Sequence, residues 1–175
     1  MTDVMLRADC AQCAALCCVS LAFDRSELFA FDKPAGAACQ HLTSCGACAI
    51  HHELERRGFS GCARYDCLGA GQRVTQEVFG GRSWRDHPEI ARQMFDAFRA
   101  MRLVHELLFL LERAGALPLP AERDARRREL MKALQPEPCW SPETLAGFER
   151  GALPDEVRDF LGSLKDCVAP RRMSR

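Results

Sequence analysis

The sequence predicts a mainly α-helical protein in which a small, irregular, cysteine-rich module packs on an α-helical bundle. Two observations predict this fold class. Nine of the 11 cysteines lie between Cys10 and Cys67, among short apolar pieces and glycines. After Gly81 the sequence instead shows helical periodicity, and only two isolated cysteines remain. We therefore predict a cysteine-cluster module over residues 1–81 and a helical region over residues 82–175.

Short elements are expected inside the cysteine-rich module. Asp32–Gly36 has the composition of a turn, because its proline presets φ. Cys48–Gly58 predicts a short helix, since two of its apolar residues recur four apart and its last glycine suits a left-handed cap. The glycine-rich loop Leu68–Gly71 leads into a second short helix, on which Val74 and Val78 share a face. We expect the rest of the module to be irregular.

A long helix over about residues 88–114 opens the helical region. Asp86 or His87 can cap it, and Pro88 suits its first turn. Glu89 would complete a capping box with Asp86. Apolar residues then recur at alternating steps of four and three, as a half-buried helix requires. This stripe comprises Ile90, Met94, Ala97, Met101, Val104, Leu108 and Leu111.

Three shorter helices follow the long one. Ser141 is the expected N-cap of the second, because a serine oxygen accepts hydrogen bonds from the first turn. The last carries apolar residues at helical spacing up to Val168. Helices of this number and length pack as a four-helix bundle. The predicted ranges are Ala121–Leu134, Pro142 to about Arg150, and Pro154 to about Cys167.

The composition is that of a folded protein without a strong charge bias. Of the 175 residues, 47% are hydrophobic and 27% are charged, and the formal net charge is zero. This balance argues against a nucleic-acid binder driven by bulk charge. The most apolar run, Leu103 to Leu111, is short and is interrupted by His105 and Glu106. We therefore expect neither nucleic-acid binding nor a membrane span.

Cysteine spacing indicates the chemistry of the module. The thiols occur in three pieces of sequence, CAQCAALCC, CQHLTSCGAC and GCARYDC. A gap of two residues lets two thiolates turn toward one ion, as in tetrahedral sulfur sites. The side chains of the adjacent pair Cys17 and Cys18 diverge, which favours two ions or a polynuclear cluster. The candidate metal ligands are Cys10, Cys13, Cys17, Cys18, Cys39, Cys45, Cys48, Cys62 and Cys67.

The cellular compartment decides how clustered cysteines are interpreted. The first residues, MTDVMLRADCAQC, lack the basic start and apolar stretch of a secretion signal. We therefore expect a cytoplasmic protein, whose reduced thiols bind metal more often than they form disulfides. A disulfide framework and simply buried thiols are the alternatives. Because soft sulfur ligands disfavour magnesium, calcium and manganese, we expect zinc, as two ions, or an iron–sulfur cluster.

The order of these motifs resembles a known family. CxxCxxxCC, GxxCxxL, CxIH and GCxxYxC follow one another as in the YkgJ-type cysteine-cluster family, a group of zinc- or iron-chelating domains. The most similar form stands at the N-terminus of some bacterial pentapeptide-repeat proteins. That form also has counterparts of Asp32–Gly36, Gly58–Gln72 and Phe79–Trp84. The resemblance covers roughly residues 10–115.

This resemblance implies eight of the nine cysteines as ligands and makes Cys45 either a further ligand or a spare thiol. It leaves the metal open, because the related cysteines of flagellin lysine methylases bind an iron–sulfur cluster. No pentapeptide repeat follows the helical part, so no function of that solenoid is expected. The eight implied ligands are Cys10, Cys13, Cys17, Cys18, Cys39, Cys48, Cys62 and Cys67.

Other side chains near the cysteines have weaker claims. His41, His51 and His52 lie beside cluster cysteines, so one of them could replace a thiolate. His105 lies inside the long helix, where we expect a satisfied helix residue. Tyr65 and Asp66 stand between two candidate ligands, where either could tune a metal cluster through hydrogen bonds to its ligands.

We predict a metal-binding protein that holds zinc or iron through cysteine thiolates and has a structural or sensing role. No pairing of nucleophile and base can be assigned, so an enzyme is not favoured. One alternative is an iron–sulfur enzyme or electron carrier acting in protein modification. Another is a metal storage or delivery protein. We expect the exposed end of the long-helix stripe to contact a protein partner or a second copy of the chain.

Overall fold

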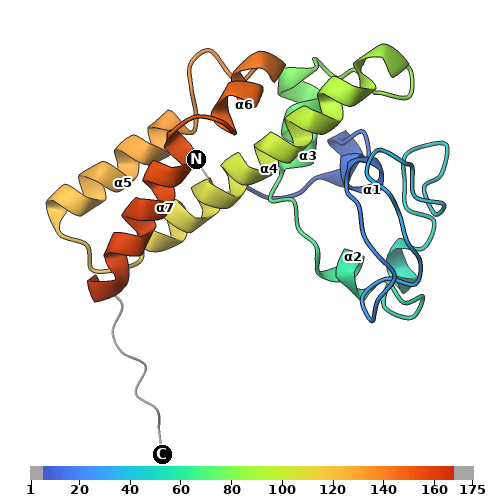
Figure 1. Cartoon of the computed structure of the whole chain (residues 1–175), viewed down its shortest axis with the longest axis horizontal. Helices are drawn as coiled ribbons and strands as arrows, with labels where there is room; N and C mark the ends of the chain where they lie inside the picture. The colour runs from blue at the N-terminus through green and yellow to red at the C-terminus, as the bar shows by residue number, and fades with distance from the viewer. Residues whose placement is uncertain (1–5, 168–175) are drawn as a thin grey trace, which may run out of the picture.

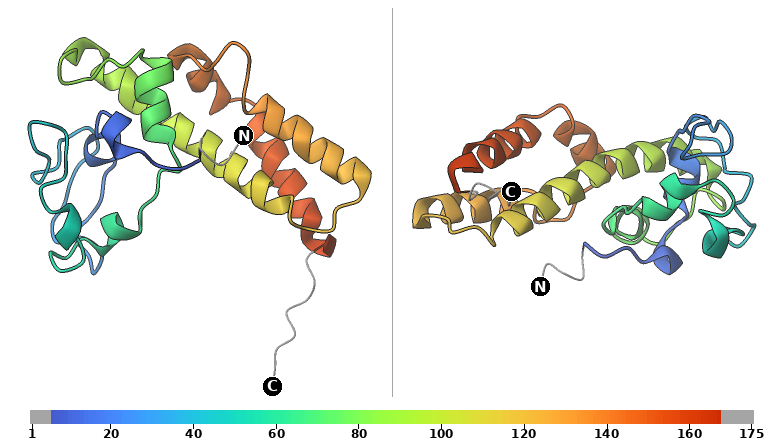
Figure 2. Two further views of the ribbon diagram at one scale, coloured as in Figure 1. Left: turned by 180° about the vertical axis from the view of Figure 1, so that it is seen from behind. Right: turned by 90° about the horizontal axis from the view of Figure 1, so that it is seen from below.

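One long helix organises the structure. The computed structural model describes residues 6–167, which are mainly helical. Helix α4 (Ala91–Ala114) runs through the molecule, with the cysteine-rich loops at one end and α5, α6 and α7 along the rest (Figure 1). Both views in Figure 2 keep the cysteine-rich loops apart from α5 and α7. Within the described residues, no helix combines the length and hydropathy that a membrane crossing requires.

Helix α4 confirms the predicted long helix. A 3-10 turn, Pro88–Ile90, leads into it, and it ends before Gly115. Its predicted apolar stripe is buried from end to end. The capping box predicted between Asp86 and Glu89 is wrong. The N-cap residue is His87, which forms no side-chain cap, and the Glu89 carboxylate lies 3.1 Å from His87 Nδ1 instead. The proline that follows lacks an N–H group, which leaves one donor fewer to be capped.

The three shorter helices are also confirmed. Ser141 caps α6 as predicted, since its hydroxyl accepts from the Thr144 N–H while the Thr144 hydroxyl accepts from the Ser141 N–H. Val168, the last residue of the predicted pattern, lies outside the described residues. The observed bounds are Ala121–Ala133 for α5, Pro142–Phe148 for α6 and Leu153–Ser163 for α7, with a 3-10 turn at Leu164–Cys167.

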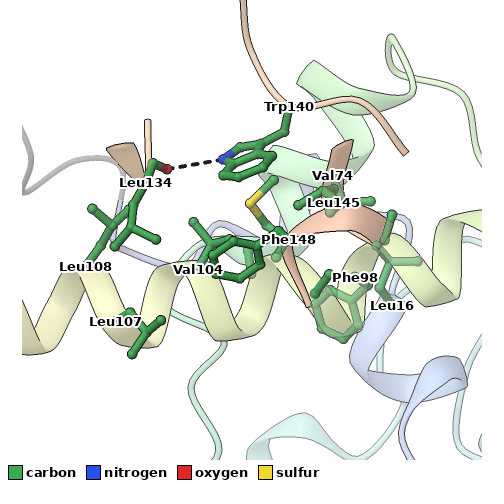
Figure 3. Close-up of a cluster of buried hydrophobic side chains, with 14 of the residues drawn as sticks. Leu16, Val74, Phe98, Val104, Leu107, Leu108, Leu134, Trp140, Leu145 and Phe148 are labelled. Atoms are coloured by element: carbon green, nitrogen blue, oxygen red, sulfur yellow. Dashed lines mark hydrogen bonds between the residues drawn. The ribbon is translucent and has the colours of Figure 1, made fainter. Parts of the chain in front are cut away.

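A continuous apolar cluster runs from the helical bundle into the cysteine-rich segment. Phe98 of α4 is fully buried, and Leu16 and Val74, from much earlier in the chain, pack into the same cluster (Figure 3). The indole N–H of Trp140 donates to the Leu134 carbonyl at 3.1 Å, which satisfies the polar atom of a buried ring. The boundary at residue 81 stays a prediction, and the apolar cluster spans both sides of it.

Short helices and turns make up the cysteine-rich segment, and its described residues form isolated β-bridges but no strand. The turn predicted at Asp32–Gly36 is present, with its glycine in the left-handed region at φ 78°. The helix predicted after the glycine-rich loop is also present. The elements are a 3-10 turn at Cys10–Gln12, α1 at Leu16–Ser20, a 3-10 turn at His51–Glu53, α2 at Ser60–Arg64, α3 at Ala70–Arg73 and a π-helical turn at Val74–Val78.

The helix predicted over residues 48–58 is wrong. The chain there forms only the 3-10 turn at His51–Glu53, followed by further turns that end at Gly58. Ile50 is the one buried residue of this stretch. Without an apolar face to bury, the stretch has nothing to offset the cost of starting an α-helix.

An aromatic cluster, which the sequence pattern did not predict, gives the cysteine-rich segment a small core of its own. Phe23 stacks on Phe29 with ring centroids 4.4 Å apart, and Phe31 meets Phe59 edge-on at 5.1 Å. Phe59 is buried, and a β-bridge between Phe23 and Lys33 holds the two sides of the loop together. Such aromatic pairs contribute about 0.5–1.5 kcal/mol each beyond their buried area.

Candidate metal centre

Helix α1 places two cysteines at the middle of the cysteine-rich segment. The sulfurs of Cys17 and Cys18 lie 4.0 Å apart, within hydrogen-bond distance. With Cys17 as the donor, this hydrogen bond raises the pKa of Cys17, and burial raises it further. The same bond lowers the pKa of Cys18, and the nearby cations Lys33 and Arg85 lower it further against the opposing effect of burial. Cys18 is therefore the more readily ionised thiol of the pair.

Cys17 belongs to a first thiol group, which we define as Cys10, Cys13, Cys17 and Cys67. Burial raises the pKa of Cys10 and of Cys13, and negative charge on the nearby Cys67 raises both further. Cys13 and Cys67 act on Cys17 in the same direction. The Cys13 sulfur also packs on Gly71, where a Cβ atom would lie only 2.6 Å from it. The thiols of this group therefore influence one another's pKa, and Cys18 also raises the pKa of Cys10.

Cys18 belongs to a second thiol group, which we define as Cys18, Cys39, Cys48 and Cys62. Burial raises the pKa of Cys62 to about 11, with the other three members adding to the shift. Burial also raises the pKa of Cys48, to which Cys18 and Cys39 contribute. The backbone supports the grouping, because the Cys39 N–H donates to the Cys18 carbonyl at 2.9 Å. An antiparallel bridge pairs Leu42 with Cys48.

The sulfurs of the two groups do not surround a common position at which an ion could be bound. Within residues 6–167, no three side chains of histidine, cysteine, aspartate or glutamate form a group that could hold a metal ion as they stand. All eleven cysteines belong to this described range, and each is a free thiol. Four thiolates at zinc-ligand distances would therefore require side-chain movements within each group.

Cys45, the ninth candidate, stands apart from both groups. Its thiol is exposed, and the Thr43 Oγ1 lies 3.1 Å from its sulfur. This hydrogen bond lowers the pKa of Cys45, followed in effect by the Ala47 backbone and by the charge of Arg85. The groups that shift it most include no other cysteine. Cys45 is thus the one candidate that we assign to neither thiol group.

A buried lysine lies beside the second thiol group, and sequence reasoning missed it. Lys33 is 4% exposed, and its ammonium donates to three carbonyls, those of Val19 at 3.1 Å, Pro34 at 3.2 Å and Ala37 at 2.8 Å. No carboxylate of the described residues forms an ion pair with it. Burial lowers the pKa of Lys33, whereas the nearby thiols, Cys39 first, act to raise it. The position of this cation within the predicted proline turn was the one signal available.

Two buried polar atoms near the thiols have no hydrogen-bond partner among the described residues: the Tyr65 hydroxyl and Arg85 Nη2. The guanidinium of Arg85 lies over the Trp84 ring, 5.3 Å from its centroid, and it packs against the turn at Gly46. Buried polar atoms in folded proteins are nearly always paired. These two atoms are exceptions to that rule among the described residues.

The histidines do not join the thiol groups. His51 and His52 are exposed on their 3-10 turn, and His41 packs edge-on against Phe59 at 5.3 Å. His105 is fully buried and hydrogen bonded at both ring nitrogens, which confirms the expectation of a satisfied helix residue.

Comparison with known proteins gives one informative match. The chain is 36% identical over 178 residues to a protein of Bacillus subtilis (strain 168) named "Uncharacterized protein YybG". The alignment covers 97% of this chain and 64% of the relative, so the chain spans somewhat less than two thirds of the length of this curated relative. No family model matches the chain, and no solved structure matches it.

Proposed function

We propose that this protein holds two metal ions, each through four cysteine thiolates, and that zinc is the ion. The observation that carries the proposal is the contact of Cys17 and Cys18 at 4.0 Å, and the effects of neighbouring thiols on one another's pKa support sorting the other six around this pair. Four thiolates are the usual ligand set of a structural zinc ion. Adjacent residues whose side chains diverge can serve two such ions.

The charges around the thiols support an anionic centre. The Lys33 ammonium is buried with only neutral carbonyl partners, which is costly for a full positive charge. A divalent ion with four thiolates carries net negative charge, so it would supply the counter-charge that Lys33 lacks. Magnesium or calcium would not fit, because both prefer oxygen ligands.

The thiol grouping also supports membership of the YkgJ-type cysteine-cluster family as a proposal. The eight cysteines at the positions of that family are the eight that lie together. Cys45, the thiol beyond the family pattern, lies apart with Thr43 and Ala47 as neighbours.

A structural or sensing role follows from where the ligands come from. The eight thiols belong to stretches that are connected mainly by turns, with the small aromatic cluster as their own core. Bound zinc would cross-link these stretches and contribute to folding, by about 10–16 kcal/mol apparent in small zinc peptides. We place the protein in the cytoplasm, where thiols stay reduced.

The helical bundle supplies a surface for a protein partner or a second copy. Phe109 and Leu110 of α4 are large apolar side chains that are 38% and 41% exposed. Both lie in the C-terminal half of α4, outside its buried apolar stripe. A metal-dependent change in the cysteine-rich segment could be sensed there through the continuous apolar cluster.

Elemental analysis of cysteine variants tests the proposal. Protein purified without oxygen should contain about two zinc ions per chain and be colourless. Cys13→Ser should lose one ion and Cys48→Ser the other, whereas Cys139→Ser, an exposed cysteine outside both groups, should keep both. Brown protein with iron and sulfide would favour the iron–sulfur alternative. Equal metal content in all four proteins would contradict the two-group assignment.

A further inference from the structure

Tyr65 lies in the sequence between cysteines of the two thiol groups, and its hydroxyl is an unpaired buried polar atom among the described residues. Tyr65 follows α2, between Cys62 of the second group and Cys67 of the first, and its N–H donates to the Cys62 carbonyl at 3.3 Å. Its hydroxyl oxygen is buried and has no partner among the described residues. Burial raises the pKa of this hydroxyl, and negative charge on Cys67 and on Cys17 raises it further.

We propose that the Tyr65 hydroxyl donates a hydrogen bond to a metal-bound sulfur of the first thiol group, that of Cys17 or Cys67. This inference rests on the proposed function, because it requires a bound ion. A neutral thiol is a weak acceptor, whereas an ionised sulfur is a strong one. The hydroxyl therefore gains its partner when metal binding ionises the thiols.

Helix α4 holds the tyrosine ring from the other side. The guanidinium of Arg102 lies over the Tyr65 ring, 5.3 Å from its centroid. Cation–π contact of this kind orients a ring without using its hydroxyl. Tyr65 thus joins the helix on one side and the sulfurs on the other.

Hydrogen bonds to ligand sulfur change the chemistry of the centre. They withdraw electron density from the sulfur, so that a metal-bound thiolate is protonated or alkylated less readily. Partners of this kind typically alter metal affinity by about 10–100-fold. Tyr65 would therefore act as a positioning and tuning residue that slows the loss of the ion held by the first group.

The chain contains a single tyrosine, which allows a direct spectroscopic test. In full-length protein prepared with isotope-labelled tyrosine, the one ring signal reports on this hydroxyl alone. Titration of metal-free protein with zinc should shift the signal of the ring carbon that bears the hydroxyl, in step with occupancy of the first group. Zinc binding that leaves this signal unmoved overturns the inference while leaving the proposed function intact.

Tyr65→Phe provides a second test, because it keeps the ring and the Arg102 contact. Its zinc should transfer to a competing chelator about tenfold faster than zinc of the wild type, for the ion of the first group only. In metal-free protein the same variant should be as stable as the wild type or slightly more so, since it removes an unpaired buried hydroxyl. Equal rates of zinc loss in the two proteins would overturn the inference. If neither protein binds zinc, the proposed function itself fails.

Discussion

The Nδ1–H of His105, on helix α4, donates a hydrogen bond of 2.5 Å to the backbone carbonyl of Leu68, the residue after Cys67. Nε2 of the same ring accepts from Arg73 Nη1 at 3.3 Å, because a guanidinium can only donate. Arg73 is in turn paired with Glu77 at 2.9 Å. A neutral imidazole thus ties the loop that carries Cys67 to the long helix.

Replacing this imidazole should be costly. His105→Leu would leave the Leu68 carbonyl and the Arg73 guanidinium without a buried partner, so we expect a loss of about 2–4 kcal/mol in the free energy of unfolding. Urea denaturation measures this loss. His52→Gln is the matched control, because His52 is exposed and its replacement should stay within about 0.5 kcal/mol. A His105→Leu protein as stable as this control would refute the assigned role.

Acid should weaken the same contact. Burial lowers the pKa of His105 from 6.5 to about 4, and the charge of Arg73 lowers it as well. Between these values the unfolded chain binds a proton that the folded chain excludes. The contribution is thus fully present above about pH 6.5 and is lost as the pH falls to about 4, by roughly 3 kcal/mol in total.

Urea unfolding at several pH values checks this linkage. The reference protein is His105→Gln, which keeps the metal ligands of the wild type and has no titrating group at this position. The stability of the wild type relative to this variant should decrease as the pH falls. A difference that stays constant from about pH 7 to pH 4 would show that His105 keeps its ordinary pKa.

Lys33 should control metal affinity through its charge. Lys33→Met keeps an unbranched side chain about as long as the lysine stem but removes the ammonium beside the second thiol group. We expect zinc affinity to fall by about tenfold or more, as for other residues that support ligands. Competition with a chelator measures it, and Lys132→Met, at an exposed position on α5, should bind zinc as the wild type does. Equal affinities in the two variants would exclude a role for this buried charge.

Replacing Gly71 should lower stability for a steric reason. In Gly71→Ala the new Cβ would lie 2.6 Å from the Cys13 sulfur, so the sulfur must move. We expect lower stability and weaker metal binding by the first thiol group. Gly162→Ala is the matched control, because nothing lies within 4 Å of its Cβ and it is inside α7, where alanine should stabilise the helix by about 0.5–1 kcal/mol. Thermal unfolding of both variants should show shifts of opposite sign.

Much of the fold could be predicted from the sequence, because local patterns dictate it. The apolar stripe from Ile90 to Leu111 predicts α4, and Ser141 predicts the start of α6. The stretch 48–58 was misread because two apolar residues at helical spacing do not ensure an apolar face that is buried. The aromatic cluster around Phe59 was missed because its rings come from segments far apart in the chain.

For the candidate site, the sequence indicates which cysteines to consider but not how they are arranged, and their metal chemistry stays a prediction. Spacing identified the cysteines, and the divergence of Cys17 and Cys18 predicted two centres. Which sulfur joins which group depends on the path of loops such as the one that brings Cys39 to Cys18. The part played by Lys33 likewise depends on tertiary contacts, because three carbonyls from separate positions surround its ammonium.

X-ray absorption at the metal edge, measured on protein purified without oxygen, tests whether cysteine thiolates bind zinc in this chain. We expect zinc bound by about four sulfur atoms at roughly 2.3 Å, in a chain that holds about two such ions. Ligands that are mainly nitrogen or oxygen, or a protein that binds no metal and still has its full helical content, would contradict this expectation.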